Sequence, residues 1–265
     1  MDIWEIVILR PMINVLIVAS KYLFSSPGLA IIVFTILIRA AMYPLTKKQL
    51  IASKKMQDLQ PRIQELQKKY GKDKQRMQKE QAALLKESGM TNIGCILPML
   101  IQMPIWIALY QSIIRVLATG PEELLNLSRY LYSSWHIVFP MVPLNSQFLW
   151  LNLGVADKFL IMPVLVAGTM WIQQKMVTPK NTDPQQAAQS QMMLVMMPLL
   201  FGFLTLSYPS GLALYWVVSN IIGIVMQYFI TGWGGLDTLW FKKKPVDTGK
   251  PSKPSPEPKV LPPAK

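Results

Sequence analysis

The stretch TILIRAAMYPLT, Thr35–Thr46, is apolar almost throughout, yet it carries a permanent cation at Arg39. From Arg39 to Leu45 a helix rises about 9 Å, and half of a bilayer's hydrocarbon layer is about 15 Å, so the arginine lies roughly 6 Å from the midplane. An arginine at the centre of a membrane helix costs roughly 2.5–3.5 kcal/mol by insertion scales. If the chain needed only a positive charge to anchor this segment at the membrane surface, Lys47 and Lys48 would supply it without this cost. Arg39 therefore indicates a wet internal cavity, and snorkelling of its side chain to the surface is the alternative.

The composition around this stretch is typical of a membrane protein. The 265 residues are 51% hydrophobic and carry a net charge of +13. Soluble domains rarely combine so much apolar and basic character, so the pair indicates apolar spans joined by basic loops. The single cysteine, Cys95, excludes an intrachain disulfide and is interpreted as a small packed apolar residue.

Five segments are long or apolar enough to cross about 30 Å of hydrocarbon, and the fourth of them is short. They are residues 28–45, 93–117, 159–176, 192–208 and 211–230. The sequence YPSG, residues 208–211, separates the last two segments and predicts a tight turn, so that they form a hairpin. The predicted fold class is an all-α membrane protein with five transmembrane helices.

The N-terminal residues 1–24 are apolar but contain six charged or helix-perturbing residues. This pattern predicts an amphipathic helix that lies on the external surface of the membrane. A sixth span is the alternative. Residues 46–92 hold 12 Lys and Arg residues, residues 118–157 hold only Arg129, and residues 231–265 hold seven. The positive-inside rule places the first loop and the tail in the cytoplasm, and five spans then leave the N-terminus outside.

The first basic loop, residues 47–89, has a helical pattern of its own. Apolar side chains are spaced by 3, 4, 3 and 4 residues, as in the seam of a coiled coil. They are Met56, Leu59, Ile63, Leu66 and Tyr70. Gly71 ends this arm, and a second polar helix runs to Gly89, which predicts a cytoplasmic helical hairpin. Pro61 is expected to kink or restart the first arm. The charges either serve topology alone or also bind lipid headgroups or a partner.

The tail, residues 231–265, is rich in proline and lysine beyond Lys242. Such a composition cannot bury a core, so the tail is predicted to be disordered. Its lysines either anchor the topology only or attract acidic surfaces such as lipid headgroups and ribosomal RNA.

Polar residues recur on one face of three of the predicted spans, as expected at 100° per residue if the spans share a cavity. The stripes comprise Thr35, Arg39 and Thr46 in the first span, Cys95, Gln102 and Trp106 in the second, and Trp216, Asn220, Gly223 and Gln227 in the fifth. An alternative explanation for the isolated Gln and Asn residues is that their amides join neighbouring membrane helices by hydrogen bonds. Three stripes together with an arginine favour a shared aqueous groove.

The sequence offers no enzyme chemistry. It contains no GxxxxGK[ST] phosphate-binding run, and its one histidine, His136, falls in the predicted external segment. Ser207 and Ser219 have no intramembrane histidine or lysine near them in sequence to act as a base. No acidic residue lies within the five predicted spans, which argues against a metal site or proton relay. We therefore expect neither an enzyme nor a cofactor.

Four motifs together resemble the YidC family of membrane protein insertases, which is related to the mitochondrial and thylakoid oxidase-assembly-type insertases. They are IRAAMYPLT (38–46), LQPRIQELQKKYG (59–71), GCILPMLIQMPIWIALY (94–110) and YPSGLALYWVVSN (208–220). The resemblance runs in order from about residue 1 to 230. The large periplasmic domain of Gram-negative members and the lipoprotein signal of many Gram-positive members do not appear, so a minimal five-span form in a bacterial inner membrane is expected.

The resemblance implies that the five helices enclose a hydrophilic groove, which opens to the cytoplasm and to lipid and is sealed outside. The family's groove arginine corresponds to Arg39. Other groove-facing positions correspond to Thr35, Gln102, Trp216, Ser219 and Asn220. A client's polar tail would enter the groove and be released outward, while its apolar helix slides along the second and fifth spans. The sliding surface would comprise Pro98, Met99, Met103 and Tyr215.

The resemblance also implies nascent membrane proteins as clients, and the ribosome and the signal recognition particle receptor as partners of the hairpin and tail. A Sec translocon and membrane lipids are further expected partners. Two other classes stay open. One is a transporter or channel that uses Arg39 for an anionic solute, although five spans divide poorly into inverted repeats. The other is a membrane scaffold, for which the polar stripes would be dispensable.

Overall fold

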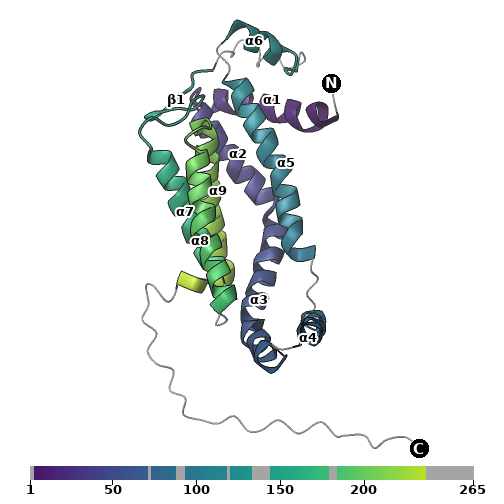
Figure 1. Ribbon diagram of the computed structural model, residues 1–265. Helices are drawn as coiled ribbons and strands as arrows, with labels where there is room; N and C mark the ends of the chain where they lie inside the picture. The colour runs from purple at the N-terminus through teal and green to yellow at the C-terminus, as the bar shows by residue number, and fades with distance from the viewer. Residues whose placement is uncertain are drawn as a thin grey trace, which may run out of the picture.

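The computed structural model describes residues 3–70, 73–87, 93–117, 120–132, 144–178 and 184–236, without the side chains of residues 74, 93–102, 121 and 184–186. This part of the chain is almost entirely helical (Figure 1). Its elements are η1 (Glu5–Leu9), α1 (Arg10–Tyr22), α2 (Pro27–Ala41), α3 (Tyr43–Tyr70), α4 (Lys74–Glu87), α5 (Ile93–Val116), α6 (Pro121–Ser128), β1 (Gln147–Phe148), β2 (Leu151–Asn152), α7 (Ile161–Val177), α8 (Pro184–Leu204), α9 (Ser210–Thr231) and η3 (Gly234–Leu236). The expected disorder of the tail beyond residue 236 lies outside the described residues.

Helix α2 has clear physical limits at both ends. Ser26 caps its first turn by accepting a hydrogen bond from the amide of Leu29, and Pro27 occupies the first helical position. The helix ends at Ala41, short of the predicted Leu45. Pro44 explains the break, because it has no amide hydrogen to donate back to the α2 carbonyls, and α3 starts at Tyr43 so that the proline falls in its first turn.

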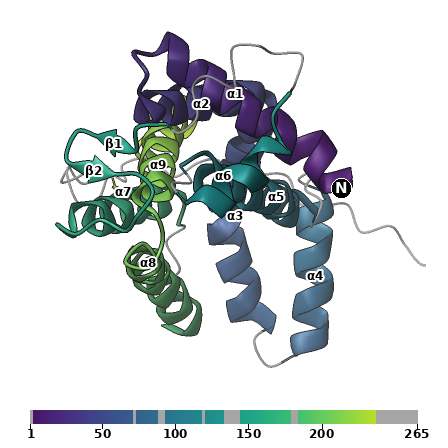
Figure 2. The ribbon, with the colours of Figure 1, turned by 90° about the horizontal axis from the view of Figure 1, so that it is seen from above.

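The N-terminal helices η1 and α1 lie across one end of the bundle (Figures 1 and 2). The chain turns by 120° between α1 and α2. Leu9, Ile13 and Ile17 are fully buried on the inner face of η1 and α1. Ile3, Val7 and other apolar residues of this N-terminal segment are exposed. The buried core of the protein is concentrated at this end, between α1, α2, α5 and the start of α9.

Helix α7 holds the last two long helices together. It packs against both α8 and α9, and α9 also packs against α2. A short turn, residues 205–209, joins α8 to α9, but α8 rests chiefly on α7 instead of forming a tightly paired hairpin with α9. Helix α8 also begins at Pro184, eight residues before the predicted start. Most of its apolar surface is exposed, including Met192, Met196 and Phe203.

The β1–β2 hairpin covers the start of α9. It pairs Gln147 with Asn152 and Phe148 with Leu151. The first amides of α9, which have no partner within the helix, donate to the carbonyls of Val155 and Leu153. Close packing here requires glycine in α2, since a Cβ at Gly28 would clash with the ring of Phe148.

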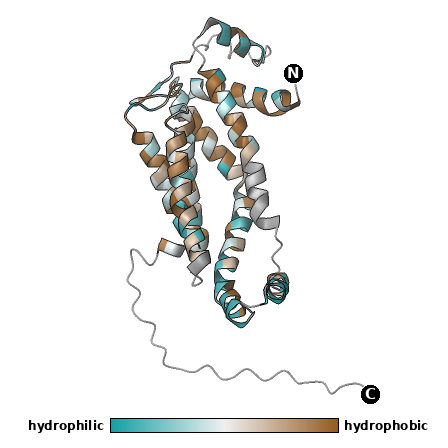
Figure 3. Cartoon of the chain, in the orientation of Figure 1, coloured by the Kyte–Doolittle hydropathy of each residue, from teal (hydrophilic) through white to brown (hydrophobic). Residues whose placement is uncertain are grey.

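Helices α3 and α4 extend from the opposite end of the bundle and lie side by side (Figures 1 and 2). They are the most hydrophilic described helices (Figure 3). Ile63 is buried, while the neighbouring side chains of α3 are exposed or half-buried. Helix α3 runs through Pro61 as one helix, so of the two expected effects of this residue, a kink or a restart, the restart is wrong. The proline has no amide hydrogen to donate within the helix, and the 28-residue helix continues beyond it.

By length and hydropathy, two helical segments among the described residues could cross a membrane, Ala187–Leu204 and Ser210–Thr231. The bent pair formed by Glu5–Tyr22 and Pro27–Ala41 would make a third if it counted as one span. Helices α2 and α7 are shorter, with 15 and 17 residues, and the side chains of α5 are described only from Met103 onward. The predicted count of five spans therefore exceeds what these helices establish.

Candidate functional site

Arg39 lies near the end of α2 and reaches across to α9. Its Nε and Nη2 atoms both donate to the hydroxyl oxygen of Ser219, at 2.9 and 2.5 Å. Ser219 itself is buried, with 2% of its surface exposed. Among the described residues no carboxylate pairs with Arg39. The hydroxyl orients the guanidinium but does not neutralise it, so an uncompensated positive charge is held between two apolar helices.

Thr35, one turn before Arg39, is completely buried against the neighbouring helices. Its hydroxyl donates to the carbonyl of Ile31 at 2.6 Å within the same helix. The polar group of Thr35 is thus satisfied by its own backbone, and its side chain is packed within the bundle one turn before Arg39.

Trp216, one turn before Ser219, belongs to an aromatic cluster. Its ring stacks on Trp106 of α5 at 6.0 Å between centroids and meets Phe201 edge-on at 5.3 Å. Tyr110 and Tyr208 complete the cluster, with their ring centroids 5.2 Å apart. This arrangement joins α5, α8 and α9, and sequence reasoning missed it, although the spacing of Trp106 and Tyr110 by four residues puts both rings on one face of α5.

Asn220 faces α7 instead of Arg39. Its amide nitrogen donates to the hydroxyl of Thr169 at 3.1 Å. One turn further along α9, Gly223 allows Gln173 of α7 to approach so closely that an added Cβ would clash with its amide nitrogen. The neighbouring polar residues Ser219 and Asn220 of α9 therefore contact different helices, Ser219 contacting α2 and Asn220 contacting α7.

An open pocket of about 390 Å³ lies beside Arg39. It is lined by Ile36, Arg39 and Ala40 of α2, Tyr43 of α3, and Ile222 and Met226 of α9. Arg39 is the only charged residue in this lining, and the other walls are apolar apart from the phenol of Tyr43. The pocket is therefore an apolar recess with a single cation.

The residues of the predicted sliding surface occupy different environments. Met103 is 46% exposed on α5, whereas Tyr215 is only 2% exposed on α9. Tyr215 is thus part of the packed core in this arrangement. The side chains of Pro98, Met99 and Gln102 lie outside the described residues, so their predicted roles are not located by the structure.

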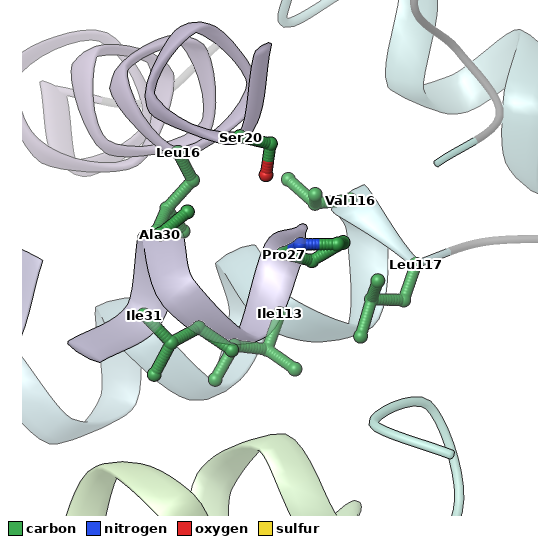
Figure 4. A pocket seen from close by; sticks show the side chains of 8 residues that line it. All are labelled: Leu16, Ser20, Pro27, Ala30, Ile31, Ile113, Val116 and Leu117. Atoms are coloured by element: carbon green, nitrogen blue, oxygen red, sulfur yellow. The ribbon is translucent and has the colours of Figure 1, made fainter. Parts of the chain in front are cut away.

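A second, much smaller cavity of about 10 Å³ lies at the elbow between α1 and α2, against α5. The buried hydroxyl of Ser20 points into it and has no hydrogen-bond partner among the described residues (Figure 4). A cavity of this size has room for about one water molecule. It is too small for a polypeptide and is separate from the pocket beside Arg39.

A cluster of polar contacts, which sequence reasoning also missed, holds α1 against the segment after α6. Asn14 is fully buried and donates to the carbonyl of Tyr130 at 2.8 Å, while its own oxygen accepts from the amide of Tyr132 at 3.0 Å. Arg10 donates to the carbonyls of Tyr130 and Leu131. An asparagine within the apolar run of residues 12–18 was the one available signal, because such a buried amide needs partners.

The same cluster includes the phenol of Tyr130, which donates to the carboxylate of Glu5 at 2.7 Å. This hydrogen bond, together with partial burial, raises the pKa of Tyr130 above its ordinary value. The guanidinium of Arg115 lies over the ring of Tyr130, 4.7 Å from its centroid. Tyr130 thus connects the N-terminal helix to α5 as well as to the loop.

The apolar exposed helices, the cation held within them and the hydrophilic α3–α4 pair together define an α-helical membrane protein. The chain belongs to the 60Kd inner membrane protein family, whose model matches residues 19–234. The resemblance to the YidC insertases that the four sequence motifs indicated is thereby confirmed.

Named relatives agree with this assignment. The membrane protein insertase YidC of Actinobacillus succinogenes is 37% identical over 227 residues, which cover 86% of this chain and 37% of that protein. YidC of Haemophilus influenzae (strain Rd) is 39% identical over 206 residues, covering 78% and 33%. YidC of Syntrophus aciditrophicus is 36% identical over 219 residues, covering 81% and 35%. The chain thus spans about a third of the length of these curated relatives.

A solved structure shares the fold. The crystal structure described as an active YidC insertase with its first transmembrane domain resolved superposes with a TM-score of 0.59. The match covers 86% of this chain and 47% of that chain, at 24% sequence identity. At this level of identity the likeness concerns the arrangement of helices.

Proposed function

We propose that this chain is a membrane protein insertase, which takes the hydrophilic tails of client proteins into a polar groove and releases their helices into the bilayer. The observation that carries the proposal is the uncompensated cation of Arg39, held by Ser219 inside an apolar bundle. A charge in this position is costly in a membrane, so it is expected to serve a function. The names of the relatives support the same activity.

The proposed membrane arrangement has five spans, formed by α2, α5, α7, α8 and α9. Helices η1 and α1 lie on the outer surface, which fits the 120° turn before α2 and the exposed apolar residues of α1. The hydrophilic α3–α4 hairpin and the basic tail lie in the cytoplasm. Helices α2 and α7 are short for a full bilayer, and a locally thinner bilayer would match their length.

In this arrangement the groove runs beside α2 and α9, from the cytoplasmic end towards Arg39. The compact core around Leu109, Ile113 and Leu212 closes the outer end. An acidic or hydrated client tail is attracted by Arg39, and the apolar client helix leaves past α5, where Met103 is exposed. The groove shortens the purely apolar path, so fewer polar groups lose their hydration in hydrocarbon.

The proposed partners follow from charge. Nascent membrane proteins are the clients. The basic α3–α4 hairpin and tail would meet the ribosome or the receptor of the signal recognition particle, and lipid headgroups offer the same negative charge. The Sec translocon is a further proposed partner.

Insertion by the purified protein in proteoliposomes tests the function. The client is a single-span protein with an acidic N-terminal tail, and its insertion is measured as protection of the tail from added protease. We expect protection with the wild-type protein, a strong decrease with Arg39→Gln, and no decrease with Lys158→Gln. The control removes one exposed positive charge near the opposite end of the bundle. Equal insertion into empty liposomes and proteoliposomes would refute the proposal.

The alternative function is transport of an anionic solute, which the open pocket beside Arg39 favours over a scaffold. The same proteoliposomes separate the two functions. Uptake of a radiolabelled anion such as phosphate, without insertion of the client, would assign the chain to transporters. Insertion without uptake supports the insertase. If the chain is a scaffold, the proteoliposomes should show neither client insertion nor anion uptake, and Arg39→Gln should change neither measurement.

A further inference from the structure

The pocket beside Arg39 opens on a flank of the α2–α9 pair. Of its lining residues, Ile36 is 48% exposed and Tyr43 is 45% exposed. Ile221 and Val225, on the adjacent face of α9, are exposed as well. In a membrane such exposed apolar residues face lipid, so this pocket is accessible from the bilayer.

The charge of the pocket calls for an anion. Arg39 uses Nε and Nη2 on Ser219, and its Nη1 has no hydrogen-bond partner among the described residues. One face of the guanidinium fork is thus available to an acceptor. Charge-assisted hydrogen bonds to phosphate or carboxylate oxygens are the strongest contacts that this group makes.

The size and walls of the pocket restrict the kind of anion. Its volume of about 390 Å³ is within the range of small-molecule sites. A helix with side chains is about 10 Å wide, so this volume holds only about one helical turn. A small hydrophilic anion would leave the isoleucine and methionine walls uncovered. An amphiphile with an anionic head and an apolar chain matches both the cation and the walls.

A second cation lies where the head of such an amphiphile would emerge. Lys47 is exposed on α3, four residues after Tyr43 and therefore on the same helical face. Arg39, Tyr43 and Lys47 thus follow one another from the interior towards the hydrophilic end of the bundle. Basic pockets between membrane helices on the cytoplasmic side are suited to anionic lipid headgroups.

We propose that this pocket is a binding site for one anionic phospholipid. Its phosphate accepts hydrogen bonds from Arg39 and Tyr43, and its acyl chains leave the open side of the pocket past Ile36, Ile222 and Met226 into the bilayer. The proposal rests on the membrane location in the proposed function and adds a ligand to it. A lipid held here covers the free side of Arg39 until a client's acidic tail takes its place.

Native mass spectrometry of the full chain tests the site. The protein is purified in detergent with equal amounts of phosphatidylglycerol and phosphatidylcholine, and the lipid retained per protein is counted. We expect one retained phosphatidylglycerol, in preference to phosphatidylcholine. Ile222→Trp, which fills the pocket, and Arg39→Gln should each lower this retention about tenfold, the equivalent of roughly 1.4 kcal/mol.

The matched control is Ile221→Trp, which adds the same bulk one residue away on an exposed part of α9 outside the pocket lining. It should retain the lipid as the wild type does. Unchanged retention in Ile222→Trp, or equal retention of both lipids, would overturn the proposal. Photo-crosslinking of an acidic client tail to position 222 with no phosphatidylglycerol retained would assign the pocket to the client instead.

Lipid retention is measured without any client, so it separates this proposal from the proposed function. Loss of insertion in Arg39→Gln with unchanged lipid retention would refute the lipid site and leave the insertase intact. Loss of lipid retention together with normal insertion of every client would support the lipid site and refute the role of Arg39 in insertion.

Discussion

Arg39 of α2 and Ser219 of α9 lie 180 residues apart in the sequence, yet the serine hydroxyl accepts two hydrogen bonds from the guanidinium. A carboxylate in the same place would cancel the charge, whereas a hydroxyl only orients it. The structure therefore combines a fixed direction with an uncancelled charge. Both features suit electrostatic attraction of an anion by a preorganised cation.

Arg39→Lys should retain much of the insertion activity, because lysine keeps the charge with a different geometry. Arg39→Ala should decrease insertion of a client with an acidic tail about tenfold, which corresponds to roughly 1.4 kcal/mol. A client with a neutral tail should insert normally in both variants. The measurement is protease protection in proteoliposomes with pairs of clients that differ only in tail charge.

Ser219→Ala is the matched test of the orienting hydroxyl, and its effect should be smaller than that of Arg39→Ala. The role of Arg39 as a free cation would be contradicted if Arg39→Ala decreased insertion equally for acidic-tailed and neutral-tailed clients and Arg39→Lys were also inactive. Arg39 would then hold α2 to α9 by directed hydrogen bonds. Intact insertion of acidic tails in Arg39→Ala would instead favour snorkelling.

Asn14→Leu should destabilise the outer end of the bundle. The side chain is fully buried, and its loss leaves the carbonyl of Tyr130 and the amide of Tyr132 without this partner. An unsatisfied buried polar group costs about 1–3 kcal/mol. The midpoint of thermal unfolding in detergent should fall by several degrees. Val15→Leu, at a partly exposed neighbouring position, is the control and should leave the midpoint unchanged.

The Tyr130–Glu5 contact should weaken in alkaline solution. The hydrogen bond to Glu5 stabilises the protonated phenol and so raises the pKa of Tyr130 in the folded protein. The contact therefore contributes stability below the ordinary tyrosine pKa of about 10 and loses it as the pH rises through the higher folded value. Tyr130→Phe should abolish this alkaline dependence, as followed by hydrogen exchange of α1. The same dependence in Tyr130→Phe would exclude this contact as its cause.

The α3–α4 hairpin should exchange its amide hydrogens faster than α7 and α9. It buries little apolar surface, with Ile63 as the one buried residue of α3, and sparse burial gives low local stability. Hydrogen exchange in nanodiscs measures the difference. Removal of residues 56–85 should impair insertion while the remaining helices keep their protection. Equal protection in hairpin and bundle would contradict this expectation.

The basic tail should bind anionic vesicles or ribosomes through charge and not through shape. Scrambling residues 242–265 should change binding little, whereas replacement of its lysines by glutamine should weaken it. Exposed charges are screened over about 10 Å at 0.1 M salt, so binding should decrease as salt increases. Binding that is insensitive to salt, measured by co-sedimentation, would refute the electrostatic explanation.

Several features follow from the sequence alone. Long apolar runs, the basic loop and the tail predict a helical membrane protein, because these signals are local and depend on composition and spacing. Arg39 stands out for the same reason, since one cation in an apolar run needs no neighbour to be noticed. The four motifs indicated the family that the comparisons confirm.

Tertiary structure decided how the polar stripes are shared. Thr35 and Asn220 belong to the predicted polar stripes, yet Thr35 bonds to its own backbone and Asn220 bonds to Thr169 of α7. The spacing of polar residues shows on which face of its own helix a side chain lies. It does not show which neighbouring helix packs against that face. The pairing of Arg39 with Ser219, the burial of Tyr215 and the pocket on the flank of α9 depend on how α2, α7 and α9 pack. That packing arises from contacts between residues far apart in the chain, which no local pattern in one sequence specifies.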